Sequence, residues 1–289
     1  MKFGTGSMDP LAIIYLRVVF AFLILAVWSW YKKYSFKIGF RDTMRIVIAG
    51  ILTGASHFLV ISGVNISQAT DASLLYVFEP LWGIILAGLF LREKLRASTV
   101  IALFIILVGL ARLSDFDLKA FGWSDGGVGF GNVLIVIGLF AESLFSIILK
   151  PVAKRHSAAM VMTLVLFVAS VVLTPLMIGR YESLFVINLS DVLVIAYLTI
   201  LCTVVGYTGW VRIMKHVPVS VMIFSIFIQP IFGPLIAAAT LGENIDARIL
   251  TGGVFLISGM FVAVVGYLRA HRREINVPAA GKLSIVGNI

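Results

Sequence analysis

Two glutamates lie inside long apolar runs of the sequence, where an ionisable side chain needs a physical reason. Glu79 stands directly before Pro80 near the middle of the run 70–90, and Glu142 stands midway along the run 131–149. An ionisable side chain near the centre of a bilayer costs about 2.5–3.5 kcal/mol on insertion scales, so it should face a cavity or a polar partner. We predict that both carboxylates bind substrate or protons. A purely structural hydrogen bond is the alternative for each.

Polar and aromatic side chains in the other apolar runs could complete a substrate site. Arg17 could neutralise one of the two acids or an anionic group of the substrate, and a purely structural arginine is the alternative. His57 could relay protons, although a hydrogen-bonded packing histidine is the simpler interpretation. Tyr207 and Trp210 share a helix face and could stack on a substrate ring, or belong only to the aromatic core. Besides the two glutamates, the predicted cavity is lined by Tyr76, Arg17, His57, Tyr207, Trp210, Ser225 and Gln229.

The sequence predicts neither a metal nor a cofactor. Its single cysteine, Cys202, excludes an intramolecular disulfide and the common multi-cysteine metal frameworks. No Gly-rich stretch has the P-loop form that ends in Lys-Ser/Thr, so no ATP site is expected. Energy would then come from a gradient, with protons moving through Glu79 or Glu142, or the protein would be a uniporter.

The composition places these residues in a membrane. Hydrophobic residues make up 60% of the chain and charged residues 13%, and the mean hydropathy is +1.06. A soluble chain is about half apolar and about a quarter charged, so this chain needs the bilayer as its solvent. The apolar runs are continuous rather than alternating, which favours helices over a barrel. We therefore predict an all-α polytopic membrane protein with nine transmembrane helices, at about 11–30, 44–63, 70–90, 98–113, 131–149, 159–178, 192–214, 219–240 and 249–268.

The distribution of charge predicts how the helices are oriented. The net charge is +9, and Lys and Arg gather in alternate loops and in the tail after Tyr267. By the positive-inside rule these loops and the C-terminal tail are cytoplasmic, as in a bacterial-type inner membrane protein. The basic charge is thus explained by topology, and nucleic acid is not an expected partner. Gly50 and Gly54 have the small-xxx-small spacing that predicts close packing of the second helix.

Three landmarks recur at a constant offset of 150 residues, which is the signature of an internal repeat. The pairs are Pro80 with Pro230, Glu93 with Glu243, and Gly109 with Gly259. We interpret all six as structural, and we expect each of the two glutamates to cap the helix that follows it.

Helix counting predicts two repeats of five helices. The helix 131–149 leads the second copy, and no such helix precedes Lys2 in the first copy, so we expect the first repeat to lack its opening helix. Because five is odd, the two copies would have opposite orientations in the membrane. The expected organisation is an incomplete four-helix repeat at 1–113, an extracytoplasmic linker at 114–130, a five-helix repeat at 131–268 and a basic cytoplasmic tail at 269–289.

With these features the chain resembles the drug/metabolite transporter superfamily, and within it the EamA-like transporter family. The resemblance is carried by Pro10 followed by Arg17 and by the three landmark pairs, and it covers nearly all of the chain apart from both tails. It implies two inverted five-helix bundles around a central cavity, which move small organic solutes, often outward from the cytoplasm. The sequence departs from the family pattern in the expected absence of the first helix and at Glu79, where an apolar residue commonly precedes the proline.

We predict a secondary transporter, an exporter or exchanger, of a small organic metabolite such as an amino acid. It would work by alternating access of the two repeats and would not be an enzyme. The expected partners are the small-molecule substrate, membrane lipids and protons, and a homodimer could rebuild the cavity if the opening helix is dispensable. The alternatives are a truncated, non-transporting membrane scaffold and a membrane-embedded enzyme acting on lipid, for which the four histidines are too scattered.

Overall fold

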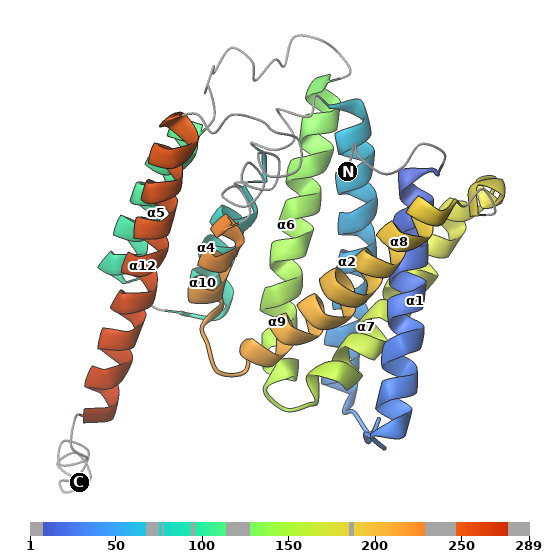
Figure 1. The fold of residues 1–289 in the computed structure, drawn as a ribbon. Coiled ribbons are helices and arrows are strands. Elements are labelled where there is room, and N and C mark those ends of the chain that lie inside the picture. The colour runs from blue at the N-terminus through green and yellow to red at the C-terminus, as the bar shows by residue number, and fades with distance from the viewer. Residues whose placement is uncertain are drawn as a thin grey trace, which may run out of the picture. The chain divides into compact units, whose positions relative to one another are not determined.

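All regular secondary structure in the described part of the chain is helical. The computed structural model describes residues 8–67, 75–76, 78–93, 96–113, 128–184, 188–228 and 247–276, and within them there is no strand (Figure 1). Six helices in these ranges are long and apolar enough to cross a membrane, so this is an integral membrane protein. They are Pro10–Tyr31, Phe40–Ile66, Gly129–Ala153, Ala158–Met177, Leu189–Ile213 and Leu250–Ala270. Phe78–Phe90 and Ala97–Arg112 are shorter apolar helices.

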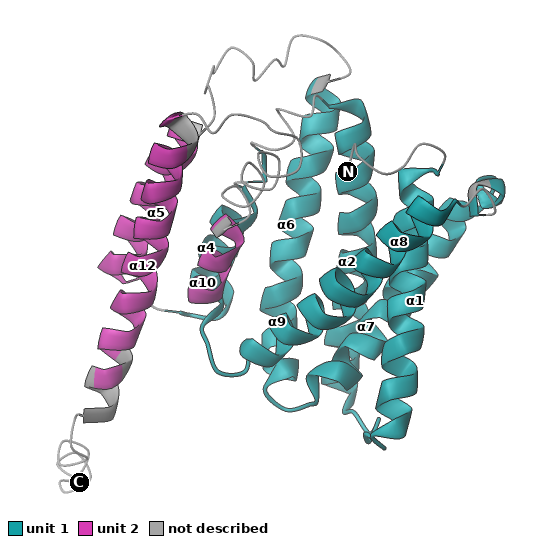
Figure 2. Ribbon diagram, in the orientation of Figure 1, with its two compact units in different colours: residues 1–93, 117–219 teal, residues 94–116, 220–289 magenta. Residues whose placement is uncertain are grey.

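Two compact units make up the chain, and each is described by itself (Figure 2). Unit 1 contains residues 1–93 and 117–219, and unit 2 contains residues 94–116 and 220–289. Each unit is therefore assembled from two segments that are far apart in the sequence.

Unit 1 is built around the helix α2 (Phe40–Ile66), which packs along both α6 (Val128–Ala153) and α7 (Ala158–Leu173). The helix α1 (Pro10–Tyr31) packs on α7. Asp9 begins α1 by accepting a hydrogen bond from the backbone N–H of Leu11 at 2.9 Å. Pro10 follows at the first helical position, where its missing N–H costs nothing.

Small residues allow α2 to approach its two neighbours closely. A Cβ atom added at Gly50 would lie 2.5 Å from the Cβ of Val168 in α7, and one added at Gly54 would lie 3.1 Å from the Cγ1 of Val172. The structure confirms the close packing that the spacing of these two glycines predicts. On the side of α6, a Cβ atom at Gly63 would lie 2.6 Å from the carbonyl oxygen of Gly131.

A long composite helix crosses unit 1 and brings its C-terminal part to α6. It begins as α8 (Leu189–Tyr197), continues as the π-helix η4 (Leu198–Tyr207) and ends as α9 (Thr208–Ile213). The α8 and η4 parts contact α1, whereas α9 contacts α7 and α6 (Figure 1). On its other side α6 packs against α4 (Phe78–Phe90).

Unit 2 contains the long helix α12 (Ala247–Asn276), which pairs with α5 (Ala97–Leu113). The helix α12 is preceded by the short helix α10 (Val219–Met222), whose first residue is the last of unit 1, and by η5 (Ile223–Ile228), which packs against α12. Figure 2 shows α5 and α12 side by side in magenta.

One glycine in each of the helices α5 and α12 allows the two helices to pack closely, and each glycine contacts the other helix. A Cβ atom added at Gly109 would lie 3.0 Å from the carbonyl oxygen of Gly252, and one added at Gly259 would lie 2.9 Å from that of Ala102. The later glycine of α5 thus meets the start of α12, and the later glycine of α12 meets the start of α5. The two helices are therefore antiparallel.

Six of the nine apolar runs correspond to helices whose ends fall within a few residues of the predicted ones, and the run 249–268 lies within α12, which continues to Asn276. The run 70–90 is helical from Phe78 and the run 219–240 is helical up to Ile228, and the other parts of both runs lie largely outside the described residues. The helix α2 begins four residues earlier than predicted, at Phe40, because its first turn includes charged residues that the hydropathy pattern assigns to the loop.

We expect Gly50→Ala to lower the free energy of unfolding by about 1–3 kcal/mol, because the added methyl group would overlap α7. Gly253→Ala is the matched control in α12. A Cβ atom there has no neighbouring atom within 4 Å, so this variant should be neutral or up to about 1 kcal/mol more stable. Thermal unfolding in detergent micelles measures both, and equal effects would refute close α2–α7 packing.

Candidate functional site

Four of the predicted site residues meet inside unit 1, on four different elements. The guanidinium of Arg17 in α1 donates a hydrogen bond to the Nε2 atom of His57 in α2. The hydroxyl of Tyr207 in η4 donates to the Oε1 atom of Glu142 in α6 at 2.9 Å. The rings of His57 and Tyr207 have centroids 6.3 Å apart, which joins the two pairs into one polar cluster. We call these four residues the intramembrane cluster.

His57 is held in one tautomer by its two partners. Its Nδ1 atom lies 2.6 Å from the carbonyl oxygen of Thr53, which can only accept a hydrogen bond, so Nδ1 carries the proton. Arg17 can only donate, so Nε2 is unprotonated and the ring is neutral. Because the only basic nitrogen of His57 already faces a cation, this arrangement favours the packing interpretation of His57 over the proton relay.

The carboxylate of Glu142 lies near several hydrogen-bond donors and charged side chains. Ser56 joins Tyr207 as a hydrogen-bonding partner of this carboxylate, and both Arg17 and Glu79 lie within electrostatic reach of it. Arg17 is buried, with 9% of its surface exposed, and its Nε atom has no hydrogen-bond partner among the described residues. Within this part of the chain, one buried donor of the site is therefore available to a ligand.

A stripe of serines on α6 extends the site along the helix. Ser146 accepts a hydrogen bond from the Nε1 atom of Trp210 at 3.0 Å, which fixes the indole that the sequence predicts as a site residue. Ser143 donates to the backbone carbonyl of Glu79 at 2.8 Å and so ties α4 to α6. Sequence reasoning did not predict Ser56 or Ser143 as site residues. The signal for Ser143 was its position directly after Glu142 in an apolar run.

The structure corrects the expected position of Glu79. The sequence places it near the middle of a helix, but α4 begins at Phe78 and Glu79 lies in its first turn. Pro80 explains this start, because a residue without an N–H is tolerated in the first turn of a helix and disrupts the interior. Tyr76 lies just before the helix with 38% of its surface exposed, and its carbonyl accepts a hydrogen bond from the N–H of Glu79 at 3.2 Å.

Apart from Glu93, the remaining predicted residues lie in unit 2 or outside the described residues. Ser225 lies in unit 2, where its hydroxyl donates to the carbonyl of Met222 at 2.7 Å. Gly109 and Gly259 pack α5 against α12, also in unit 2. Gln229, Pro230 and Glu243 lie outside the described residues.

Glu93 binds residues that are far away in the sequence. Its Oε1 atom accepts hydrogen bonds from the Nζ of Lys150 and from the backbone N–H of Val219, each at 3.0 Å. Lys150 also donates to the carbonyl of Val217 at 2.9 Å. The helix whose first N–H it binds begins at Val219, far from Glu93 in the sequence. Capping of the helix that follows Glu93 in the chain stays a prediction.

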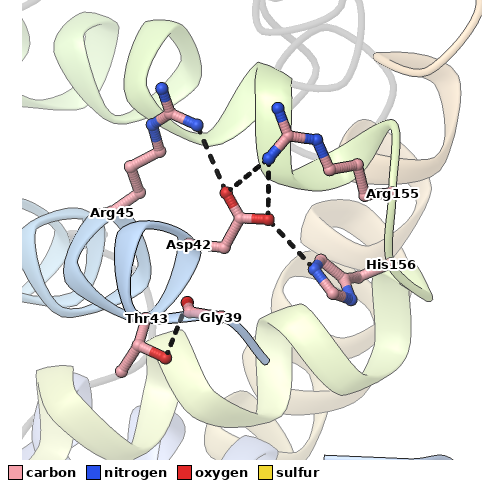
Figure 3. Close-up of polar contacts among 6 residues, drawn as sticks. All are labelled: Gly39, Asp42, Thr43, Arg45, Arg155 and His156. Atoms are coloured by element: carbon pink, nitrogen blue, oxygen red, sulfur yellow. Dashed lines mark hydrogen bonds and ion pairs between the residues drawn. The ribbon is translucent and has the colours of Figure 1, made fainter. Parts of the chain in front are cut away.

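A second charged cluster, which the sequence analysis did not predict as a site, surrounds Asp42 at the start of α2 (Figure 3). Arg155 donates to both carboxylate oxygens at 3.0 Å, and the Nε2 atom of His156 lies 3.2 Å from Oδ2. Arg45, one turn along α2, lies 3.2 Å from Oδ1. Asp42 is 5% exposed. This carboxylate therefore ties the start of α2 to the turn between α6 and α7.

The chain is similar to known transporters in sequence and to a solved structure in fold. The model of the EamA-like transporter family matches residues 1–114 and 129–265. An uncharacterised transporter of Archaeoglobus fulgidus is 22% identical and covers 91% of this chain and 90% of its own length. A probable terminal-alkyne amino-acid exporter of Streptantibioticus cattleyicolor is 22% identical and covers 82% of this chain and 78% of its own length. A solved crystal structure has the same fold, with a TM-score of 0.77 and 18% identity over 92% of this chain and 91% of that one.

We expect Asp42→Asn to lower the free energy of unfolding by about 1–3 kcal/mol, because it removes a buried charge with three charged or polar partners. Asp9→Asn is the matched control. Asp9 pairs with Arg180 at 2.7 Å in an exposed position, and Asn caps a helix as well as Asp, so the loss should stay below about 1 kcal/mol. Thermal unfolding measures both variants, and equal losses would contradict the structural role of Asp42.

Proposed function

We propose that this chain, which belongs to the EamA-like transporter family, is a secondary transporter that exports or exchanges a small organic metabolite such as an amino acid. Relatives named as a probable amino-acid metabolite efflux pump and a probable terminal-alkyne amino-acid exporter support this substrate class. The observation that carries the proposal is the intramembrane cluster, because ionisable side chains inside transmembrane helices mark substrate or proton sites.

The arrangement of charges in this cluster fits a zwitterionic cargo. Arg17 binds a neutral imidazole and has an unpaired Nε, and Glu142 binds two hydroxyl groups. The hydrogen-bond partners of both side chains are therefore neutral groups, and a zwitterionic ligand could bind between the two opposite charges, which lie within electrostatic reach of each other. In this proposal Arg17 binds the carboxylate of an amino acid. Glu142, helped by Glu79, binds its ammonium group or a proton, and Tyr76, Tyr207 and Trp210 border the cargo.

We further propose that two inverted repeats alternate in access around this site. Two observations support the repeats: the family model matches two separate segments, and the contacts of α5 with α12 are reciprocal. Gly109 contacts Gly252, and Gly259 contacts Ala102. Gly109 and Gly259 are 150 residues apart, and so are Ala102 and Gly252, so the two contacts join equivalent positions of the two copies. Such reciprocity is expected of a two-fold relation between antiparallel copies.

The proposed organisation keeps the boundaries that the sequence predicts. The first repeat occupies 1–113, the linker 114–130, the second repeat 131–268 and the tail 269–289, with nine transmembrane helices in all. The turns after α1 and after α6 lie at the same end of unit 1 (Figure 1). Both turns are rich in Lys and Arg, so we assign this end, and the basic tail, to the cytoplasmic side of the inner membrane.

We expect Glu142→Gln to lower substrate flux about tenfold or more and to flatten its dependence on pH, because the amide neither binds a cation nor titrates. Glu79→Gln should have the same effects in weaker form. Flux is measured in proteoliposomes against a panel of amino acids, over a range of pH values. Glu182→Gln, in an exposed turn, is the control and should leave both properties unchanged. The proposed coupling fails if both Gln variants behave like this control.

Arg17→Gln should raise the KM for an amino-acid substrate about tenfold or more, because it removes the charged partner of the carboxylate. It should have little effect on the KM for the corresponding amino-acid amide, which carries no carboxylate. Competition of each compound with a labelled amino acid gives both values. Arg41→Gln, at the exposed start of α2, controls for loss of positive charge. An equal rise for acid and amide would mean that Arg17 does not bind the carboxylate.

A further inference from the structure

The composite helix that carries Tyr207 and Trp210 has an unusual middle. Its ten residues Leu198–Tyr207 form a π-helix between two α-helical parts, within one apolar span from Leu189 to Ile213. π-helices are rare, they occur mostly as single turns, and they are frequent at functional sites. This segment is longer than a single turn, and its last residue is the one that binds Glu142.

The register of the π-helix determines which side chains of the composite helix face α6. Tyr207 and Trp210 bind Glu142 and Ser146, one turn apart on each helix, at 2.9 and 3.0 Å. A π-turn, closed from residue i to i+5, holds one residue more than an α-turn. Returning one such turn to α geometry would rotate everything after it by about 100° relative to everything before it.

The start of the composite helix cannot follow such a rotation freely. Asn188 and Asp191 form a capping box at the start of α8, with hydrogen bonds of 2.9 and 3.2 Å. Both α8 and the π-helix also pack against α1. With the start fixed in this way, only the π register places Tyr207 and Trp210 on their partners in α6.

One side chain of the π-helix bonds to the backbone of the same π-helix over five residues. The hydroxyl of Thr203 donates to the carbonyl of Leu198, five residues earlier, at 2.9 Å. Thr203 is 1% exposed. In an α-helix a threonine hydroxyl bonds the carbonyl three or four residues earlier, so a bond over five residues fits the π form. Thr199 is a natural comparison in the same segment, because it is 2% exposed and its hydroxyl has no partner within the part of the chain that the structure describes.

We infer that Thr203 is a positioning residue: its hydroxyl holds the segment in the π register and thereby keeps Tyr207 on Glu142. Conversion of a turn to α geometry would withdraw Tyr207 and Trp210 together and leave Glu142 open to cargo or a proton. The segment would thus act as a register switch for the site. Only this last step rests on the proposed function, because the register and its contacts exist whether or not the protein transports.

The test uses the native cysteine as its reporter. Cys202 is the only cysteine in the sequence, it is exposed, and it lies in the π-helix next to Thr203. A spin label on Cys202 of the full-length protein in detergent reports the register through its spectral line shape. We expect Thr203→Val to change this line shape. Thr199→Val should leave it as in the wild type, and so should Thr203→Ser, which keeps a hydroxyl.

A double-mutant cycle on thermal stability tests the link to Tyr207. Tyr207→Phe removes the bond to Glu142 and should lower Tm by about 2–4 °C in the wild type and in the Thr199→Val background. In the Thr203→Val background it should lower Tm by much less, because the bond is already lost.

Two results would overturn the inference. One is an equal effect of Tyr207→Phe in all three backgrounds, and the other is a change of the label spectrum by Thr199→Val as large as that by Thr203→Val. Neither measurement depends on flux, so the role of Thr203 can fail or succeed independently of the proposed transport.

Discussion

Polar groups in the core of a bilayer have no water to bind, and this constraint governs the whole structure. Helices satisfy it for the backbone, and the side chains of Ser and Thr satisfy it by bonding back to their own helix. Thr53 and Thr163, for example, each donate to the carbonyl four residues earlier at 2.9 Å. Several polar side chains that do not bond locally bond to another helix, as Tyr207 and Trp210 do, and such bonds help to assemble the helices of unit 1.

Ionic side chains follow this rule in two different ways. At the helix ends, Asp42 and Glu93 are surrounded by cations and donors that neutralise them, so these sites act as structural ties. Inside the apolar span, Arg17 and Glu142 bind neutral groups instead. These two opposite charges lie within electrostatic reach of each other. Buried charges are expensive, and proteins keep them inside membranes where an opposite charge, a ligand or a proton can compensate them. This difference separates the intramembrane cluster from the clusters at the helix ends.

Close helix packing and the polar cluster depend on each other. The glycines of α2 bring α6 and α7 close to its backbone, and this places Ser56 and His57 of α2 near Glu142 of α6. In hydrocarbon the association of helices relies on such packing and on hydrogen bonds between helices, because lipid tails are as apolar as the side chains they replace. The π-helix adds a further requirement, since the register of one helix sets which donor meets Glu142.

The amino-acid sequence was sufficient to predict the class of protein, most helix positions, the close packing at Gly50 and Gly54, and the polar residues that stand inside apolar runs. These features depend on local composition and spacing, which hydrophobic periodicity and insertion energies capture. The partners of these residues became known only from the folded chain. Arg17 donates to His57, Glu93 reaches Val219, and Tyr207 reaches Glu142 through a π register. Each of these contacts joins segments far apart in the chain, and their geometry follows from how whole helices pack, which no local pattern encodes.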